Sequence, residues 1–273
     1  MSSLDFENDC FFLMFIGTPR SGHSIIGAIL DAHPNAIISH ELHALQKISQ
    51  GWTALQLLEG IAETSAKQAA AGRSQSQIDH NEEYFQEAKA TEMNYRFDYA
   101  IPTQFQGRAE GAIKVIGDKK GGGTTTILAD NPGLLMELDS MIQHQIKLIY
   151  VVRNPYDNIA TMSFRSGNSL VSQIEKYRWY IENLHVVLDN EQFECLTIYQ
   201  EDFIDEPKKN LELICEWLDL ESIHSFIEDS ASIVYKSPHQ SRDRVEWGDS
   251  EIEAVKGIID KWPVLSKYDQ TPF

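Results

Sequence analysis

The feature that most constrains the fold is the stretch of residues 11–33, where an apolar run, a glycine-framed turn and a second apolar pattern follow one another. The run at 11–16 predicts a buried strand, and the apolar spacing after Ser24 predicts a helix with one inward face. Gly17 and Gly22 frame the four residues between them, and such a turn lets successive backbone N–H groups and a helix N-terminus surround an anion. We therefore expect an oxyanion-binding loop between a strand and a helix.

The turn differs from the P-loop of nucleotide triphosphatases, because His23 stands where that loop has lysine and the fixed positive charge lies at Arg20. Residues 19–24 read Pro-Arg-Ser-Gly-His-Ser. They resemble the 5′-phosphosulfate loop of the sulfotransferases: proline, lysine or arginine, serine, glycine, threonine, then threonine or serine. The resemblance implies that the loop binds the donor 3′-phosphoadenosine 5′-phosphosulfate (PAPS). The loop residues concerned are Arg20, Ser21, Gly22, His23 and Ser24.

Length and charge narrow the function classes. The 273 residues contain no repeat and no linker-like stretch, so we expect one domain over residues 1–273. Lys and Arg number 23 against 41 Asp and Glu, which gives a net charge of −18 and argues against nucleic acid or an anionic membrane as a partner. An anionic ligand must then be met by local positive charge.

The cysteines and the N-terminus indicate the compartment. Cys10, Cys195 and Cys215 lack metal-ligand spacing, and we expect buried thiols in a reducing environment and no metal site. The first ten residues are acidic and lack the basic start of a signal peptide, and no apolar run is long enough for a bilayer. These features predict a cytoplasmic protein.

A carboxylate follows the next expected strand. Residues 36–39 predict a short strand, so His40 and Glu41 fall at its carboxyl end, where doubly wound sheets bind ligands. Glu41 is the candidate general base, with His40 or His43 as the fallback. The alternative is that Glu41 only complements a helix dipole.

A lysine occupies the corresponding place after the strand predicted at residues 112–117. Lys119 lies at that strand's carboxyl end, ahead of three glycines. Lysine beside glycines can also be a solvated loop. The strand position favours Lys119 as a catalytic cation.

The clearest buried strand, at residues 146–152, runs directly into Arg153. Asn154 suits a helix N-cap and Pro155 the first helical position, so Arg153 lies between strand and helix, well placed to fork two hydrogen bonds onto a phosphate. Thr161 follows eight residues later. The pair resembles the sulfotransferase 3′-phosphate signature, an arginine followed eight residues later by serine. The alternative is a salt bridge from Arg153 to an acid.

Three later positions complete the candidate site. A helix at 170–188, a strand at 195–198 and a helix opening at Pro207 are predicted. Tyr199, after that strand, resembles the family's tyrosine near the adenine, although this chain has glutamine directly before the glutamate. Arg242 and Arg244 lie in a loop that resembles the family's late basic loop over the 3′-phosphate, and one of the two is expected to bind it.

Residues 42–105 predict a helical insertion, interpreted as a lid or acceptor-binding region. Within it, Phe97, Tyr99 and Phe105 either line a pocket or belong to the core. The inward stripe of its first helix is predicted from the spacing of Leu55, Leu58 and Ala62.

Taken together, the motifs resemble those of PAPS-dependent sulfotransferases, nearer to the tyrosylprotein, Golgi-type and bacterial branches than to the cytosolic one. The resemblance implies a three-layer α/β/α P-loop fold with a central, mostly parallel sheet. It also implies sulfuryl transfer from PAPS to a hydroxyl or amine, leaving adenosine 3′,5′-bisphosphate (PAP), without a metal. Glu41, Lys119 and Arg20 would be catalytic. The acceptor and the oligomeric state stay open.

Two rival functions stay open at this stage. A small-molecule or nucleotide kinase would use the same fold, with Asp118 as the candidate Mg²⁺ ligand at a strand end. A non-catalytic nucleotide-binding module would keep the loop without the chemistry. Turnover with any acceptor distinguishes the module from an enzyme.

Overall fold

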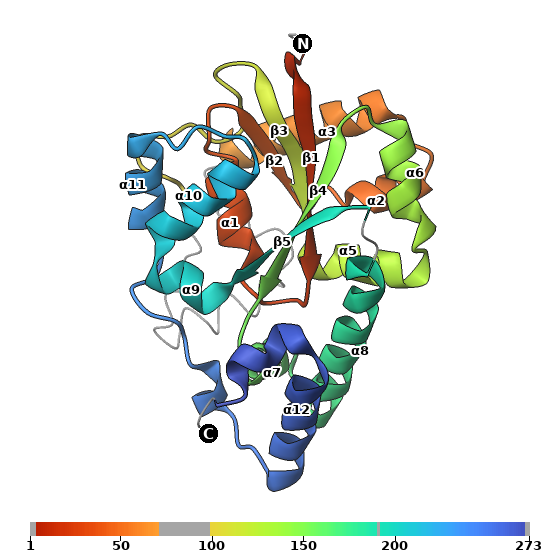
Figure 1. Cartoon of the computed structure of the whole chain (residues 1–273), viewed down its shortest axis with the longest axis vertical. Helices are drawn as coiled ribbons and strands as arrows, with labels where there is room; N and C mark the ends of the chain where they lie inside the picture. The colour runs from red at the N-terminus through yellow and green to blue at the C-terminus, as the bar shows by residue number, and fades with distance from the viewer. Residues whose placement is uncertain (1–3, 71–98, 190–191, 271–273) are drawn as a thin grey trace.

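The computed structural model describes residues 4–70, 99–189 and 192–270. The described residues form one parallel sheet in the order β2-β3-β1-β4-β5 (Figure 1). Its strands are β1 (Phe6–Gly17), β2 (Ala36–His40), β3 (Ile113–Lys119), β4 (Gln145–Val152) and β5 (Glu194–Tyr199). Strands β2 and β3 lie on one side of β1, and β4 and β5 lie on the other, so the strand order reverses beside β1. Open α/β sheets bind ligands at such a switch point.

Apolar side chains alternate between two cores, one on each face of the sheet. In β1, Phe12 and Met14 belong to one buried cluster, and Leu13 and Phe15 to the other. A strand buried on both faces reads as a continuous apolar run, which is why this strand was visible in the sequence. The three-layer α/β/α fold predicted from the sequence is confirmed.

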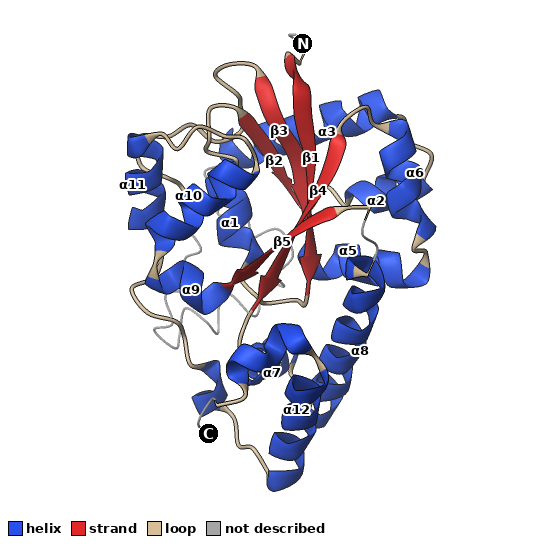
Figure 2. Ribbon diagram, in the orientation of Figure 1, coloured by secondary structure: helices blue, strands red, loops and turns tan. Residues whose placement is uncertain are grey.

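Helices cover both faces (Figure 2). Buried side chains assign one face to α1 (His23–Leu30), α9 (Gln200–Asp205), α10 (Pro207–Trp217) and α11 (His224–Ser232). Those of the other core come from α2 (Ala44–Ser49), α3 (Ala54–Ala70), α5 (Gly121–Asp130), α6 (Gly133–Met141), α7 (Pro155–Ser166), α8 (Leu170–Leu188) and α12 (Asp249–Lys261). Two short 3-10 helices, η1 (Ser241–Arg244) and η2 (Pro263–Tyr268), flank α12.

Several predicted boundaries need correction. Strand β3 extends through Lys119, and the glycines after it form the first turn of α5 instead of a loop. In α3 the fully buried apolar residues are Leu57 and Ile61. Of the predicted stripe, Leu58 and Ala62 are partly buried and pack against the core, whereas Leu55 is 65% exposed. Phe97 lies outside the described residues.

The cysteines are free thiols, and two of them, Cys10 and Cys215, are buried. Cys195 is only partly buried, against expectation, because β5 lies at the edge of the sheet. No helix in the described part of the chain is long and apolar enough to cross a membrane.

Candidate active site

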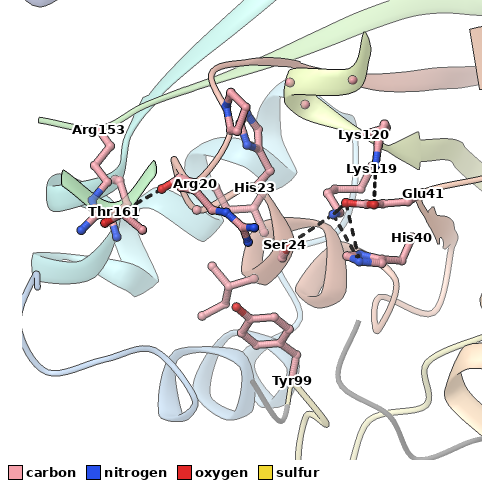
Figure 3. Close-up of a pocket in the computed structure, with 18 of the residues that line it drawn as sticks. Arg20, His23, Ser24, His40, Glu41, Tyr99, Lys119, Lys120, Arg153 and Thr161 are labelled. Carbon is pink, nitrogen blue, oxygen red and sulfur yellow. Dashed lines mark hydrogen bonds and ion pairs between the residues drawn. The ribbon is translucent and has the colours of Figure 1, made fainter. Parts of the chain in front are cut away.

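The turn between β1 and α1 is braced from inside. Ser21 is buried, and its hydroxyl lies 2.6 Å from Thr18 Oγ1, donates to the Thr18 carbonyl and accepts from Asn158 Nδ2 at 2.8 Å. Arg20 and Gly22 have φ angles of 70° and 102°, in the left-handed region. The Ser21 side chain therefore shapes the turn, while the exposed Arg20 side chain lines a cavity beside it (Figure 3).

His23 has a structural contact that the sequence did not reveal. Its Nε2 donates to the carbonyl of Ile16 at 2.9 Å, and burial lowers the pKa of the ring to about 4, so the imidazole is neutral. A Cβ on Gly17 or Gly121 would lie 2.6 or 2.5 Å from the ring. The ring thus fills the space between the turn and α5, and it brings no positive charge to an anion.

The N-terminus of α1 faces the same cavity. Gly22 is its N-cap and provides no side-chain hydrogen bond to the first turn. Backbone N–H groups at such an end are oriented toward an anion. Ser24, in this first turn, also lines the cavity.

Glu41 and two lysines form a compact charged cluster at the ends of β2 and β3. Lys119 Nζ lies 2.9 Å from Glu41 Oε1, and Lys120 Nζ lies 2.5 Å from Oε2 (Figure 3). Lys119 Nζ also donates to Ser24 Oγ at 3.1 Å and lies 3.4 Å from His40 Nε2. Lys119 therefore joins the anion-binding turn to the candidate base.

Burial and neighbouring charges oppose each other at both Glu41 and Lys119, and the pKa of each is lowered. Burial alone would raise the pKa of Glu41, but the charges of Lys119 and His40 and the hydrogen bonds from both lysines together hold that pKa well below its usual range. Burial lowers the pKa of Lys119, and the charge of Glu41 opposes this shift. Glu41 is thus an ionised carboxylate here.

Arg153 connects three separate segments. Nη1 donates to the Arg20 carbonyl at 3.2 Å and to Thr161 Oγ1 at 3.0 Å, and Nη2 donates to the His239 carbonyl at 3.1 Å and to Ser241 Oγ at 3.0 Å. The buried Nε has no hydrogen-bond partner. Each described hydrogen bond goes to a carbonyl or hydroxyl oxygen, so the alternative of a salt bridge to an acid is not what the structure shows.

The predicted cap of α7 explains the position of Arg153. Asn154 Oδ1 accepts from the N–H groups of Tyr156 and Asp157 at 3.0 and 3.4 Å, and Pro155 occupies the first turn. Strand β4 ends at Val152 and α7 begins at Pro155, so Arg153 lies in the short link between them, next to the cap residue. Thr161 then lies two turns along α7 and reaches back to the guanidinium.

Three of the predicted residues, Ser21, Tyr199 and Arg242, do not line the cavity. Ser21 is buried beneath the turn. Arg242 donates two hydrogen bonds to the Asp157 carboxylate, from Nε to Oδ1 at 3.2 Å and from Nη2 to Oδ2 at 2.9 Å, so the carboxylate already neutralises its charge. The hydroxyl of Tyr199 donates to the Val264 carbonyl at 3.0 Å. Arg244 and Gln200 line the cavity in their place.

One cavity of about 800 Å³ joins these groups. Its lining contains Arg20, Gly22, His23, Ser24, Glu41, Lys119, Arg153, Thr161 and Arg244 from the predicted set. Tyr99 also lines it, whereas Phe105 is 54% exposed and packs against Arg108. Among the lining residues that the structure describes, Glu41 is the only acid, while the Arg and Lys side chains are Arg20, Lys47, Lys119, Lys120, Arg153, Arg165 and Arg244.

Asp118 does not fit the role of a metal ligand. Its Oδ1 accepts from the Ser39 hydroxyl at 2.7 Å and from the Leu42 N–H at 2.9 Å, and its Oδ2 accepts from the Ala44 N–H at 2.9 Å. The kinase alternative thus lacks its candidate Mg²⁺ ligand, because both oxygens already hold the protein backbone in place.

Lys120 and Ser241 are among the cavity residues that sequence reasoning missed. Lys120 follows Lys119 directly, and the pairing of both with Glu41 depends on where β2 and β3 end. Ser241 carries no sequence signal of its own, because it reaches Arg153 only through the folding of the late loop.

Comparisons with known proteins agree on one family. The model of the sulfotransferase family matches residues 13–224. The sulfotransferase domain of the Synechococcus PCC 7002 olefin synthase aligns with a TM-score of 0.53 at 17% identity, over 95% of this chain and 98% of that one. The sulfotransferase domain of the curacin biosynthetic pathway aligns with a TM-score of 0.50 at 15% identity, over 93% and 98%. A comparison with curated protein sequences found no match.

These structural neighbours share the fold, and the family model covers the turn after β1, Glu41, Lys119, Arg153 and Thr161 in one continuous match. Because that match extends over well more than half of the chain, the protein belongs to the sulfotransferase family.

Proposed function

We propose that this protein transfers a sulfuryl group from PAPS to a hydroxyl or amine of an acceptor. The observation that carries the proposal is the single cavity that joins two anion-binding regions to a Lys–Glu pair, with Glu41 as the only acid among its described lining residues. In a chain of net charge −18, such a concentration of Arg and Lys is expected where a polyanionic ligand binds.

The turn after β1 suits the 5′-phosphosulfate end of the donor. Backbone N–H groups at the start of α1 have no side-chain cap, and Arg20 and Lys119 line the cavity at this end. Amide dipoles and cations that are fixed before the ligand arrives stabilise negative charge without reorganisation. These groups would offset the charge that develops on the sulfuryl and leaving phosphate oxygens.

Arg153, Thr161 and Ser241 suit the 3′-phosphate. Arg153 Nε is buried without a partner, and the two hydroxyls lie 3.0 Å from the guanidinium. A phosphate accepts hydrogen bonds from both a guanidinium and hydroxyl groups. Arg244 is the candidate from the late basic pair, because it lines the cavity while Arg242 pairs with Asp157.

The donor, when bound, supplies the sulfuryl group and leaves as PAP. The acceptor oxygen or nitrogen forms a bond to sulfur while the bond from sulfur to the bridging phosphate oxygen breaks, and the acceptor loses a proton. Glu41 is the proposed general base for this proton. Lys119 would stabilise the charge on the transferred group, since it already reaches from Glu41 to Ser24.

Glu41 can act as a base only if its pKa rises above the value set by its two lysines. Lys119 is the group that can change this, because an anionic donor at the turn competes with Glu41 for the ammonium group. His40, whose Nε2 lies 3.9 Å from Glu41 Oε1, is the alternative base.

The assignment of the base is tested with Glu41→Gln, which keeps the size and hydrogen-bonding capacity of the side chain. PAP should bind within about threefold of the wild-type affinity, while ³⁵S transfer from labelled PAPS to a panel of phenols, alcohols and amines should fall by about 100-fold or more. If Glu41→Gln keeps near-normal transfer and His40→Ala or His43→Ala abolishes it, the base is a histidine. A wild-type protein that transfers nothing to any acceptor would support the non-catalytic module.

A further inference from the structure

The turn that carries Glu41 has an unfavourable backbone conformation. Glu41 and His43 have φ angles of 64° and 65°, in the left-handed region that non-glycine residues rarely adopt. Such a conformation is unfavourable for a residue with a Cβ and persists only where surrounding contacts enforce it. The position of the Glu41 carboxylate therefore depends on what holds the backbone on either side of it.

Two contacts hold the residues up to Glu41. The side-chain amide of Gln68, from α3, donates to the His40 carbonyl at 2.8 Å and accepts from the His40 N–H at 3.2 Å. The Glu41 N–H donates to the Lys119 carbonyl at 3.2 Å. These bonds extend the pattern of β2 as far as Glu41, but they do not reach the residues after it.

The buried carboxylate of Asp118 holds those later residues. Its oxygens accept from the N–H groups of Leu42 and Ala44, both at 2.9 Å, and from the Ser39 hydroxyl at 2.7 Å. One carboxylate thus spans both left-handed residues and ties them to β3. A carboxylate suits this role because it has two acceptor oxygens and no hydrogen of its own.

Strand geometry links this contact to Lys119. In the pairing of β2 with β3, Ser39 is opposite Asp118 and His40 is opposite Lys119. Successive side chains on a strand point to opposite faces, so Asp118 reaches the turn and Lys119 reaches the Glu41 carboxylate from neighbouring positions. The two residues fix the backbone and the side chain of Glu41 separately.

We propose that Asp118 is a positioning residue, which locks the turn at residues 41–44 so that Glu41 faces Lys119 and the cavity. The inference rests on the proposed function, because Glu41 is taken as the base. In Asp118→Asn one oxygen becomes an NH₂ group, which faces a backbone or hydroxyl donor instead of accepting from it. At least one of these donors loses its partner, and the left-handed turn relaxes.

The catalytic test is a double-mutant cycle of Asp118→Asn and Glu41→Gln, followed by ³⁵S transfer from PAPS. Asp118→Asn alone should lower kcat by about 10- to 100-fold, a size typical of a misplaced catalytic group, with the Kd for PAP within about threefold of wild type. In the Glu41→Gln background the same substitution should change kcat by less than about threefold. An equal fall in both backgrounds overturns the proposal, because Asp118 would then act independently of Glu41.

Asp31→Asn is the matched control. Asp31 is equally buried and also accepts three hydrogen bonds, from the Ile38 and Gly107 N–H groups and the Ser65 hydroxyl, but none of these partners belongs to the turn at residues 41–44. Its loss should affect thermal stability while kcat stays within about threefold of wild type. A fall in kcat as large as that of Asp118→Asn would show a general effect of losing a buried carboxylate.

Amide hydrogen exchange provides a readout that does not depend on activity. The N–H groups of Leu42 and Ala44 should exchange slowly in the wild type and in Asp31→Asn, and at least about tenfold faster in Asp118→Asn. Unchanged exchange rates in Asp118→Asn contradict the proposal even if the protein transfers no sulfuryl group, so the two failures are distinguishable. Should Asp118→Asn not fold, Ser39→Ala removes one of the three donors and should show the same pattern with a smaller change.

Discussion

Replacing Arg153 with alanine should weaken PAP binding selectively through the 3′-phosphate. The guanidinium lies between the turn after β1, α7 and the late loop, and it is only 7% exposed. Solvent therefore screens its charge little, and a phosphate placed beside Thr161 and Ser241 would receive its hydrogen bonds in a largely dry environment.

The size of the effect follows from the number of bonds lost. A bidentate arginine–phosphate contact consists of two charge-assisted hydrogen bonds, one from the Nε that has no partner and one from an Nη group that exchanges a hydroxyl acceptor for the phosphate. Each contributes about 1.5 kcal/mol at the lower limit. The sum of about 3 kcal/mol corresponds to a rise in Kd of about 100-fold. Loss of the bonds to the Arg20 and His239 carbonyls adds a smaller, indirect term by loosening two loops.

The assay is isothermal titration calorimetry with two ligands, PAP and adenosine 5′-monophosphate, which lacks the 3′-phosphate. In the wild type PAP should bind far more tightly than the monophosphate, and Arg153→Ala should remove most of this difference. Arg178→Ala is the control, because Arg178 is a surface arginine of α8 paired with Glu175. Equal weakening of both ligands in Arg153→Ala, or unchanged PAP affinity, would refute the assigned role.

Two further predictions concern the interior of the site. The pKa of His23 is about 4 in the folded chain and 6.5 in the unfolded chain, so the unfolded state binds more protons between these pH values. Lowering the pH from 6.5 to 4 should therefore reduce the free energy of unfolding, measured by urea titration, by about 3 kcal/mol more in the wild type than in His23→Gln. Parallel pH curves for the two proteins would contradict a buried neutral ring. A Cβ at Gly27 would lie 2.7 Å from Lys119 Cγ, so Gly27→Ala should displace Lys119 and lower kcat by about tenfold. The control is Gly257→Ala in α12, where a Cβ would meet nothing within 4 Å and kcat should not change. Equal kcat values in the two variants would argue against a fixed position of Lys119.

Much of the fold could be predicted from local sequence patterns. The helix predicted at 170–188 coincides with α8, and the strand at 146–152 differs from β4 by one residue, because long periodic or wholly apolar segments leave few alternatives. The turn after β1 and the pair Arg153 and Thr161 were recognised from short motifs. Their residues lie close in space because they are close along the chain.

The contacts that the sequence did not reveal are long-range. Arg242 and Arg244 are equivalent in the sequence, and only the position of Asp157 on α7 shows that Arg242 pairs with that carboxylate. Likewise the sequence suggested Asp118 as a metal ligand, whereas its three partners come from the neighbouring strand and the turn beyond it. In α3 the predicted stripe was right for Leu58 and Ala62 but wrong for Leu55, because packing of α3 against β2 buries Leu57 and Ile61 instead.

Thermal unfolding with two ligands decides whether the cavity binds a 3′-phosphorylated adenosine donor or a nucleoside triphosphate. Unfolding is followed with PAP in EDTA, and separately with ATP and Mg²⁺. PAP without metal should raise Tm in a concentration-dependent manner, because a ligand that binds only the folded state stabilises it by mass action, and ATP with Mg²⁺ should leave Tm unchanged. Stabilisation by ATP with Mg²⁺ and none by PAP would rule out this donor site and favour a kinase.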